Sequence, residues 1–345
     1  MRLFKNAHYD FMGNRKWAFL GSTLLIIIGL ISLAVKGPKF GVDFAGGTIV
    51  QVKFLKEAVD LAKIRQALGE LNLGDVSIQQ FGSKTDNEVL ISLQKTTSSL
   101  EGLSEGIRQS LAKVFPNQGF EIRRVEMVGP KVGSDLRTKG LWALILSLGG
   151  ILIYAWYRFD FAFAVGGIGA LAHDVLITIG AITLTNREFS LTVLAALMTI
   201  IGYSINDTIV IYDRVRENIR LKRGGNTLSD ILNTSVNECL ARTLLTALTT
   251  FFVATSLYLF GGQVINDFAF CMVIGVITGC YSTIFIASPV ALWIHDKDKA
   301  RAQRASAAES SSRMAAHGAK ATTSKIAAMD KAQKSAKKDK VQGSV

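Results

Sequence analysis

The sequence predicts a polytopic α-helical membrane protein that carries one small α+β domain. Apolar residues are concentrated in six blocks, each about long enough to cross the hydrocarbon core of a bilayer. Residues 37–140 contain no such block and show short strand and helix patterns instead. The basic residues are concentrated on links that would lie on one side of the membrane.

The first apolar block, residues 17–35, follows a short basic segment. The block is longer than the apolar region of a secretory signal peptide, and the residues after it match a cleavage site poorly. A cleavable signal peptide is the alternative, but an uncleaved signal anchor fits better. We therefore assign residues 1–16 to a cytoplasmic N-terminus and residues 17–36 to the first span, with the basic flank inside.

Residues 37–140 are expected to form an α+β domain on the opposite, periplasmic side. Alternating and β-branched runs predict strands, and apolar residues at helical spacing predict helices. The expected strands are residues 48–54, 76–81, 88–93 and 120–128, and the expected helices are residues 58–71 and 100–115. This β-α-β-β-α-β order is typical of a ferredoxin-like domain, a fold that does not by itself indicate a function.

The segment GVDFAGGT, residues 41–48, precedes the first predicted strand. The pair Gly46 and Gly47 permits unusual backbone dihedrals or a close backbone approach. The segment is not a phosphate-binding loop, because no GxxxxGK[ST] pattern occurs in the chain. Taken alone, Asp43 is best interpreted as a turn or cap residue.

Residues 141–294 are expected to form the remaining five spans. The corresponding apolar blocks are residues 141–157, 161–185, 189–212, 243–260 and 268–294. The link 213–242, which we predict to be a cytoplasmic loop, is rich in Arg and Lys, whereas the link 261–267 contains neither. This distribution agrees with the positive-inside rule for a multi-pass protein whose two termini are both cytoplasmic.

Residues 295–345 are expected to form a disordered basic cytoplasmic tail. They contain twelve Lys and Arg against five Asp and Glu, and they have too few apolar residues to form a core. A solvated tail is the favoured interpretation, with anionic lipid or RNA as alternatives. Nucleic-acid binding by the chain as a whole is not expected, because its aromatic residues are not interleaved with basic ones.

An acidic residue, Asp207, interrupts the cytoplasmic third of the fourth span. Tyr203 lies one helical turn before it on the same face, and Asn206 is adjacent. Arg242 opens the fifth span at a similar depth, and Thr246 continues its face. An ionisable residue in a span is costly, which favours a proton or ion site over the alternative of a structural ion pair. A displacement of Arg242 would change the proton affinity of Asp207.

Asp174, near the middle of the third span, is a second buried acid. A proton relay and a helix-to-helix hydrogen bond are both open interpretations of Asp174. His173 points roughly 100° away on a helix, so we expect it to have a packing role. Tyr203 and Asn206 are expected either to orient Asp207 or to hydrogen-bond across helices.

No catalytic or metal-binding constellation is present. The three cysteines show no CxxC spacing, and the four histidines show no metal-ligand pattern. We therefore expect no enzymatic activity, no catalytic residue, no metal and no cofactor.

Four segments resemble the SecD/SecF family, the membrane subunits of the bacterial Sec protein-export system and relatives of RND transporters. They are GVDFAGGT, LAHDVLIT, GYSINDTIVIYDRVREN and ARTLLTALTT. The resemblance covers about residues 17–294. It implies an RND-like half of six spans with a periplasmic domain, and a proton-conducting role for Asp207 and Arg242.

The resemblance also implies partners and a location. It implies a heterodimer with SecD in the bacterial cell inner membrane, acting with the SecYEG channel and a YajC-like accessory subunit on a translocating polypeptide. The pair would use the proton-motive force to promote translocation.

Two other functions are considered. An RND-type small-molecule exporter is the first alternative, although such chains normally contain both six-span halves. A purely structural scaffold is the second, and it predicts that Asp207 and Arg242 can both be neutralised without loss.

Overall fold

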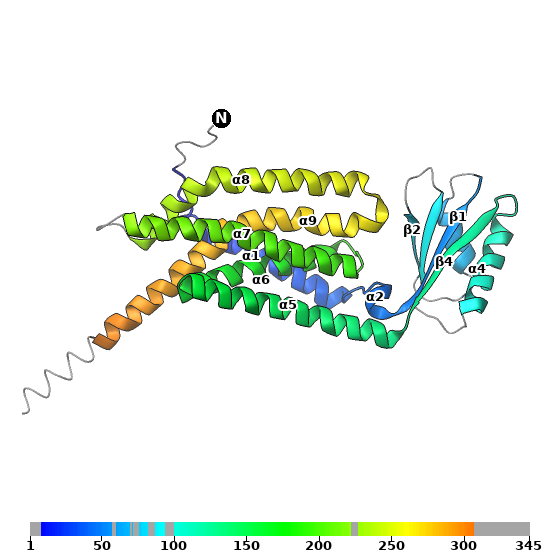
Figure 1. Cartoon of the computed structure of the whole chain (residues 1–345), viewed down its shortest axis with the longest axis horizontal. Helices are drawn as coiled ribbons and strands as arrows, with labels where there is room; N and C mark the ends of the chain where they lie inside the picture. Colours follow the sequence, from blue (N-terminus) through cyan, green and yellow to red (C-terminus); the bar gives the residue numbers. More distant parts are fainter. Residues whose placement is uncertain are drawn as a thin grey trace, which may run out of the picture. The chain divides into compact units, whose positions relative to one another are not determined.

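The computed structural model describes residues 8–56, 60–69, 71, 76–81, 87–93, 100–221 and 227–306. The chain divides after Leu292 into two units. The first unit contains a bundle of long helices and a small sheet domain (Figure 1).

In the described part of the chain, six helical segments are long and apolar enough to cross a membrane. They are α1 (Arg15–Lys36), α5 (Pro130–Arg158), α6 (Phe161–Leu184), α7 (Leu191–Leu221), α8 (Leu228–Phe260) and the segment Val264–Ser306. The last segment includes most of α9 (Gly262–Ser282) and a π-helical turn, η1 (Thr283–Ala287). The predicted class of polytopic membrane protein is confirmed.

The helices of the bundle differ in how much of their surface they bury. Helices α6, α7 and the segment containing α9 bury the largest share of their apolar windows, whereas α1, α5 and α8 leave most of theirs exposed. Large side chains such as Leu146, Ile153, Val253 and Phe260 are exposed on the outer helices. An apolar surface of this kind is suited to contact with lipid or with another membrane subunit.

The sheet domain has the predicted ferredoxin-like topology. Its elements are β1 (Gly47–Phe54), α3 (Leu61–Gly69), β2 (Val76–Phe81), β3 (Glu88–Leu93), α4 (Leu100–Val114) and β4 (Phe120–Val128). The strands are antiparallel in the order β2-β3-β1-β4. Alternate β1 residues Val50, Val52 and Phe54 are fully buried, and they pack in one cluster with Ile64 of α3 and Ile107 of α4. Both helices therefore cover the same face of the sheet.

Two predicted boundaries are wrong because hydropathy locates the apolar part of a helix rather than its ends. The α+β domain was expected to extend to residue 140, but α5 begins at Pro130, in the favoured first position of a helix. The expected cytoplasmic loop 213–242 is mostly helical, because α7 continues to Leu221 and α8 begins at Leu228. The latter start is fixed by a capping box between Thr227 and Asp230.

The prediction of a disordered tail is wrong for residues 295–306, which are helical. Ala, Arg, Lys and Gln dominate this stretch and are strong helix formers even without a core to pack against. Residues 307–345 lie outside the described residues. In the second unit, Lys297 Nζ lies 3.5 Å above the centre of the Trp293 ring.

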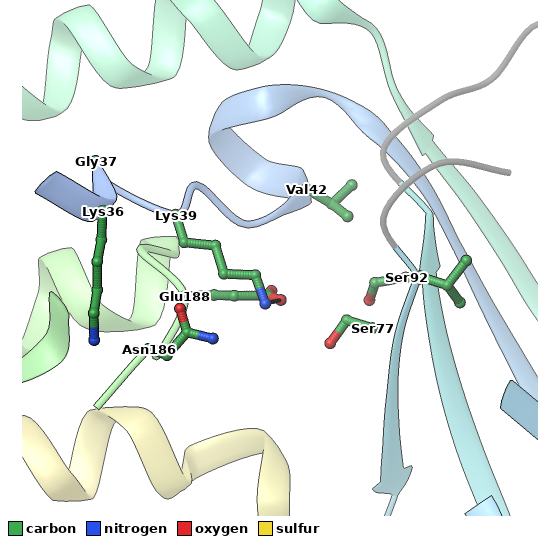
Figure 2. A pocket seen from close by; sticks show the side chains of 9 residues that line it. Lys36, Gly37, Lys39, Val42, Ser77, Ser92, Asn186 and Glu188 are labelled. Carbon is green, nitrogen blue, oxygen red and sulfur yellow. Dashed lines mark ion pairs between the residues drawn. The ribbon is translucent and has the colours of Figure 1, made fainter. Parts of the chain in front are cut away.

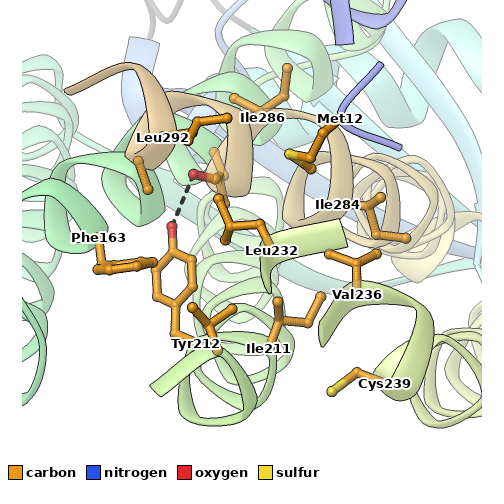
Figure 3. Packing of buried hydrophobic residues seen from close by; sticks show 14 of the residues in the cluster. Met12, Phe163, Ile211, Tyr212, Leu232, Val236, Cys239, Ile284, Ile286 and Leu292 are labelled. Atoms are coloured by element: carbon orange, nitrogen blue, oxygen red, sulfur yellow. Dashed lines mark hydrogen bonds between the residues drawn. The ribbon is translucent and has the colours of Figure 1, made fainter. Parts of the chain in front are cut away.

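The π-helical turn η1 lies just before Pro289, which cannot donate the backbone hydrogen bond of a regular helix. The Tyr212 hydroxyl of α7 donates to the Ala287 carbonyl oxygen at 3.1 Å (Figure 3). Around it, Met12, Ile211 and Ile284 belong to a buried cluster that joins the N-terminal segment, α7, α8 and the end of the last span. This hydrogen bond joins α7 to the last residue of the π-helical turn inside the core.

Candidate functional site

Asp207 lies on α7 where that helix packs against α8. Its side chain is buried, with 2% of the residue exposed. Thr246 Oγ1 of α8 lies 3.5 Å from Asp207 Oδ1, but the same hydroxyl lies 3.1 Å from the Arg242 carbonyl and 3.0 Å from the Thr243 carbonyl. A hydroxyl has one proton to donate, so the carboxylate competes poorly for it.

The second oxygen of this carboxylate, Oδ2, has no hydrogen-bond partner among the described residues. The same holds for the buried hydroxyls of Tyr203 on α7 and Thr243 on α8. Buried polar atoms are normally paired with protein or with ordered water. This part of the α7–α8 interface is therefore suited to take up water, a proton or a group from another subunit.

Arg242, at the start of the predicted fifth span, is exposed on α8. Within the described residues, no carboxylate oxygen lies within 4.0 Å of its guanidinium. Arg242 is nevertheless the charged group that acts electrostatically on Asp207. Asn206 is also exposed. The structure thus brings Asp207, Thr246 and Tyr203 together, while Arg242 and Asn206 lie at the open edge of the same helix pair.

Asp174 of α6 occupies a different environment, saturated with hydrogen-bond donors. Its Oδ2 accepts from the hydroxyls of Ser204 on α7, at 2.7 Å, and Ser282 on α9, at 2.8 Å. Its Oδ1 lies 3.0 Å from Nδ1 of His173. Asp174 is 1% exposed, and both serines are fully buried. Asp174 therefore joins three helices. Its carboxylate is not hydrogen-bonded to that of Asp207.

The expected packing role of His173 is incomplete. Its Nε2 lies 3.1 Å from Ser22 Oγ of α1, and its ring stacks on Tyr281 of α9 with the centroids 5.9 Å apart. The side chains of adjacent helical residues point in different directions, yet His173 Nδ1 lies within hydrogen-bond distance of the Asp174 carboxylate. Ser22, Ser204, Ser282 and Tyr281 were not identified from the sequence, because serine and tyrosine are common in spans without any polar role.

The GVDFAGGT segment holds the start of α7. It contains the short helix α2 (Val42–Ala45), and Asp43 Oδ2 accepts a hydrogen bond from the Leu191 backbone N–H at 2.9 Å. Asp43 is therefore a cap, but for a helix far away in the sequence. Gly46 has φ +79°, and a Cβ added there would lie 2.8 Å from the Pro130 Cα. Gly47 also has a positive φ, +146°. The glycine pair meets both expectations, unusual dihedrals and close backbone approach.

A second connection joins the same segment to the α6–α7 link. The Gly41 N–H donates to the Phe189 carbonyl at 2.8 Å, and the Phe189 N–H donates to the Lys39 carbonyl at 2.7 Å. Lys39 also pairs with Glu188 at 3.2 Å. Figure 2 shows this pair at the wall of a polar cavity of about 420 Å³ between the end of α1 and strands β2 and β3. The segment that precedes β1 is thus joined to the beginning of α7 and to the link before it.

No metal or thiol site is evident in the part of the chain that the structure describes. No group of three or more His, Cys, Asp or Glu side chains there could hold a metal ion. Cys239, Cys271 and Cys280 are free thiols.

Comparisons with known proteins agree with the four sequence segments. Residues 107–297 match the model of the C-terminal region of the protein-export membrane proteins SecD and SecF. Residues 31–54 match the model of the SecD/SecF GG motif. The chain belongs to the SecD/SecF family.

Its relatives place it on the SecF side of that family. A protein translocase subunit SecF from Calditerrivibrio nitroreducens is 51% identical over 84% of this chain and 95% of its own length. Another, from Magnetococcus marinus, is 45% identical over 84% of this chain and 92% of its own length.

The fold is also similar to that of solved SecDF structures. SecDF from Thermus thermophilus, a translocon-associated membrane protein, matches with a TM-score of 0.72 and 33% identity over 86% of this chain. A SecDF structure in the super-membrane-facing form matches with a TM-score of 0.66 and 34% identity over 89% of this chain. The chain spans only 40% and 41% of those two proteins.

Proposed function

We propose that this protein is an accessory subunit of the Sec protein translocase that, with SecD, uses the proton-motive force to promote protein translocation. The SecF relatives match along nearly their whole length, which supports the assignment to the translocase. The SecDF chains are more than twice as long as the match, so a second RND-like half is needed. SecD would supply that half.

The observation that carries the proposal is the incompletely paired carboxylate of Asp207. A buried carboxyl group that lacks firm donors, with an exposed arginine on the neighbouring helix, is suited to bind and release a proton. When Asp207 is ionised it attracts Arg242, and when it is protonated that attraction is lost. Thr246 and Tyr203 would support the site, with Asn206 at its open edge, and Asp174 would serve as a second acid in the same bundle.

Helix α7 provides a physical link from this site to the sheet domain. Asp43 caps α7 at Leu191, and sixteen residues at 1.5 Å per residue place Asp207 about 24 Å further along the same helix. A change in how α7 and α8 pack around Asp207 would therefore shift the start of α7, where Asp43 binds the helix and where Gly46 and Gly47 lead into the sheet domain. One charge crossing the membrane field supplies about 2.3 kcal/mol per 100 mV.

The proposal includes a location and partners. The protein would cross the bacterial inner membrane six times, with both termini in the cytoplasm and the sheet domain in the periplasm. The basic residues between α7 and α8 and after the last apolar block support this orientation. The SecYEG channel and a YajC-like subunit would be its further partners, and a translocating polypeptide its cargo.

The test compares two acids on the same helix. Asp207→Asn keeps the side-chain shape but cannot ionise, and Asp213→Asn changes an acid that pairs with Arg158 at 2.6 Å outside the proposed site. Each variant is co-expressed with SecD, and proton flux and export driven by the proton-motive force are measured in inner-membrane vesicles. We expect the Asp207 variant to lose both and the Asp213 variant to retain them. Normal coupling in the Asp207 variant would reject the mechanism and favour a structural scaffold.

A further inference from the structure

A continuous series of hydrogen bonds connects α1 with α9, α6 and α7. The Tyr281 hydroxyl donates to the Ala18 carbonyl at 2.7 Å, and the Ser22 hydroxyl lies 3.1 Å from the Tyr281 oxygen. Ser22 then contacts His173 Nε2, and His173 Nδ1 contacts Asp174. Every one of these contacts is buried or half-buried, so water does not readily replace a missing donor.

The direction of each hydrogen bond follows from the first one. A backbone carbonyl cannot donate, so the single Tyr281 proton must point to Ala18. The Tyr281 oxygen can then only accept from Ser22, which uses the single Ser22 proton. The Ser22 oxygen in turn must accept from His173, so Nε2 of His173 carries a proton.

The contact between His173 Nδ1 and Asp174 Oδ1 also requires one proton, on either atom. On oxygen, the pair is a neutral acid with a neutral imidazole. On nitrogen, it is a carboxylate with an imidazolium. Both forms have zero net charge and leave Oδ2 free to accept from Ser204 and Ser282. A neutral pair is far less costly to bury than a lone carboxylate.

We propose that His173 and Asp174 form a second proton site, in which one exchangeable proton occupies the Nδ1–Oδ1 contact and maintains the hydrogen bond from Ser22 of α1 to Tyr281 of α9. When a water molecule removes this proton as hydronium, the remaining imidazole proton moves to Nδ1 to serve the carboxylate. Nε2 is then a bare acceptor, so the Ser22 hydroxyl must turn from Tyr281 to His173. The hydrogen bond from Ser22 to Tyr281 is lost as the site empties, whereas the Tyr281 hydroxyl keeps its bond to the Ala18 carbonyl.

The surroundings contain few charges that would compete with this pair. Among the described residues, the side chains that contact the Asp174 carboxylate are His173 and two serines. Helix α1 offers Ser22, α9 offers Ser282 and the titratable Tyr281, and α7 offers Ser204. The nearest acid on α7 is Asp207, about one helical turn beyond Ser204. The proposal deepens the proton-driven function and rests on it for a role in export, but its chemistry can be measured separately.

The experiment observes His173 directly by ¹⁵N NMR in the full-length chain, reconstituted in vesicles with ¹⁵N-labelled histidine. The chain has four histidines, and replacing His8, His295 and His317 with Gln leaves His173 as the sole signal. We expect a protonated Nε2 at neutral pH and a change of tautomer when the pair loses its proton at higher pH. A bare Nε2 with a protonated Nδ1 at every pH, with no change of tautomer on titration, would overturn the proposal.

Two variants and a control test the network. Asp174→Asn has the shape of the neutral acid and can donate to Nδ1, so Nε2 should stay protonated throughout the titration. Ser22→Ala removes the Nε2 partner and should shift the Nε2 signal. Ser32→Ala removes a buried hydroxyl on the same helix that has no partner among the described residues, and it should shift nothing. A pH-dependent tautomer change retained in the Asp174 variant would refute the shared proton.

A negative result for the His173–Asp174 site can be distinguished from a negative result for the proposed export function. The NMR measurement needs neither SecD nor export, whereas the Asp207 experiment depends on both. The expected His173 result together with normal coupling in the Asp207→Asn variant would leave the second proton site standing without its role in export.

Discussion

Replacing Gly180 with Ala should pull α1 away from α6 and break the contact between Ser22 and His173. The two helices cross at Gly29 and Gly180, and a Cβ added at Gly180 would lie 2.8 Å from the Gly29 Cα. Two non-bonded carbon atoms are in favourable van der Waals contact at about 3.5 Å, so the two helix backbones must separate by about 0.7 Å. Ser22 and His173 each lie two helical turns before the glycines, in matching register.

The size of the effect follows from the hydrogen-bond length. The distance between His173 Nε2 and Ser22 Oγ is 3.1 Å. If α1 moves as a rigid body, that distance becomes about 3.8 Å, which is too long for a hydrogen bond. Over-packing of this kind typically costs about 1–3 kcal/mol of stability.

The assay combines thermal unfolding of the purified chain with the ¹⁵N signal of His173. We expect Gly180→Ala to lower the unfolding midpoint and to shift the Nε2 resonance in the same direction as Ser22→Ala. Gly169→Ala is the control, because a Cβ added at that position of α6 meets nothing within 4 Å. Identical midpoints and spectra for the two glycine variants would show that the close contact does not set the helix spacing.

Three further changes concern the attachment of the sheet domain and the α6–α7 link at the same end of the bundle. Gly46→Ala should destabilise the protein by more than about 1 kcal/mol, because φ is positive and Pro130 is too close, whereas Gly129→Ala, with φ −65°, should be tolerated in the same denaturation assay. Asp43→Ala should cost about 0.5–2 kcal/mol by uncapping α7 and Asp43→Asn much less, as measured by the unfolding midpoint. Arg187→Lys should lose about 2 kcal/mol, seen as a lower denaturation midpoint, since a lysine cannot pair with Asp267 and stack on an aromatic ring as the guanidinium does.

The topology of the sheet domain was predictable because its signals are local. In β1 and β3, buried residues alternate with partly exposed ones, and the sequence between β2 and β3 is short and polar. Helix ends in the bundle were less predictable. Lys131 and Arg137 in α5 are polar, so they end an apolar block, yet they are good helix formers and the helix includes them. Composition therefore identifies the part of a helix that suits the membrane and underestimates its length.

The two acids were identifiable from the sequence because a charge in an apolar block stands out. The hydrogen-bond environments of these acids could not be predicted from the sequence. The capping of α7 by Asp43 joins residues 148 positions apart, and no local pattern encodes such a contact. The partners of Asp174 on α7 and α9, and the partner of His173 on α1, could not be predicted either, because the register between helices depends on the packing of small residues such as Gly29 and Gly180.

The contrast between the two acids assigns them different physical roles. Asp174 has a donor for each oxygen, so a change in its protonation must reorganise bonds that already hold three helices. Asp207 has one oxygen without a partner and one weak contact, so a proton or cation can arrive there without first breaking anything. Exchange with the outside is therefore easiest at Asp207. Asp174 is the acid at which a change of charge does most to helix packing. A proton-driven subunit needs both properties, and in this fold the two acids lie in the same bundle, Asp174 on α6 and Asp207 on α7.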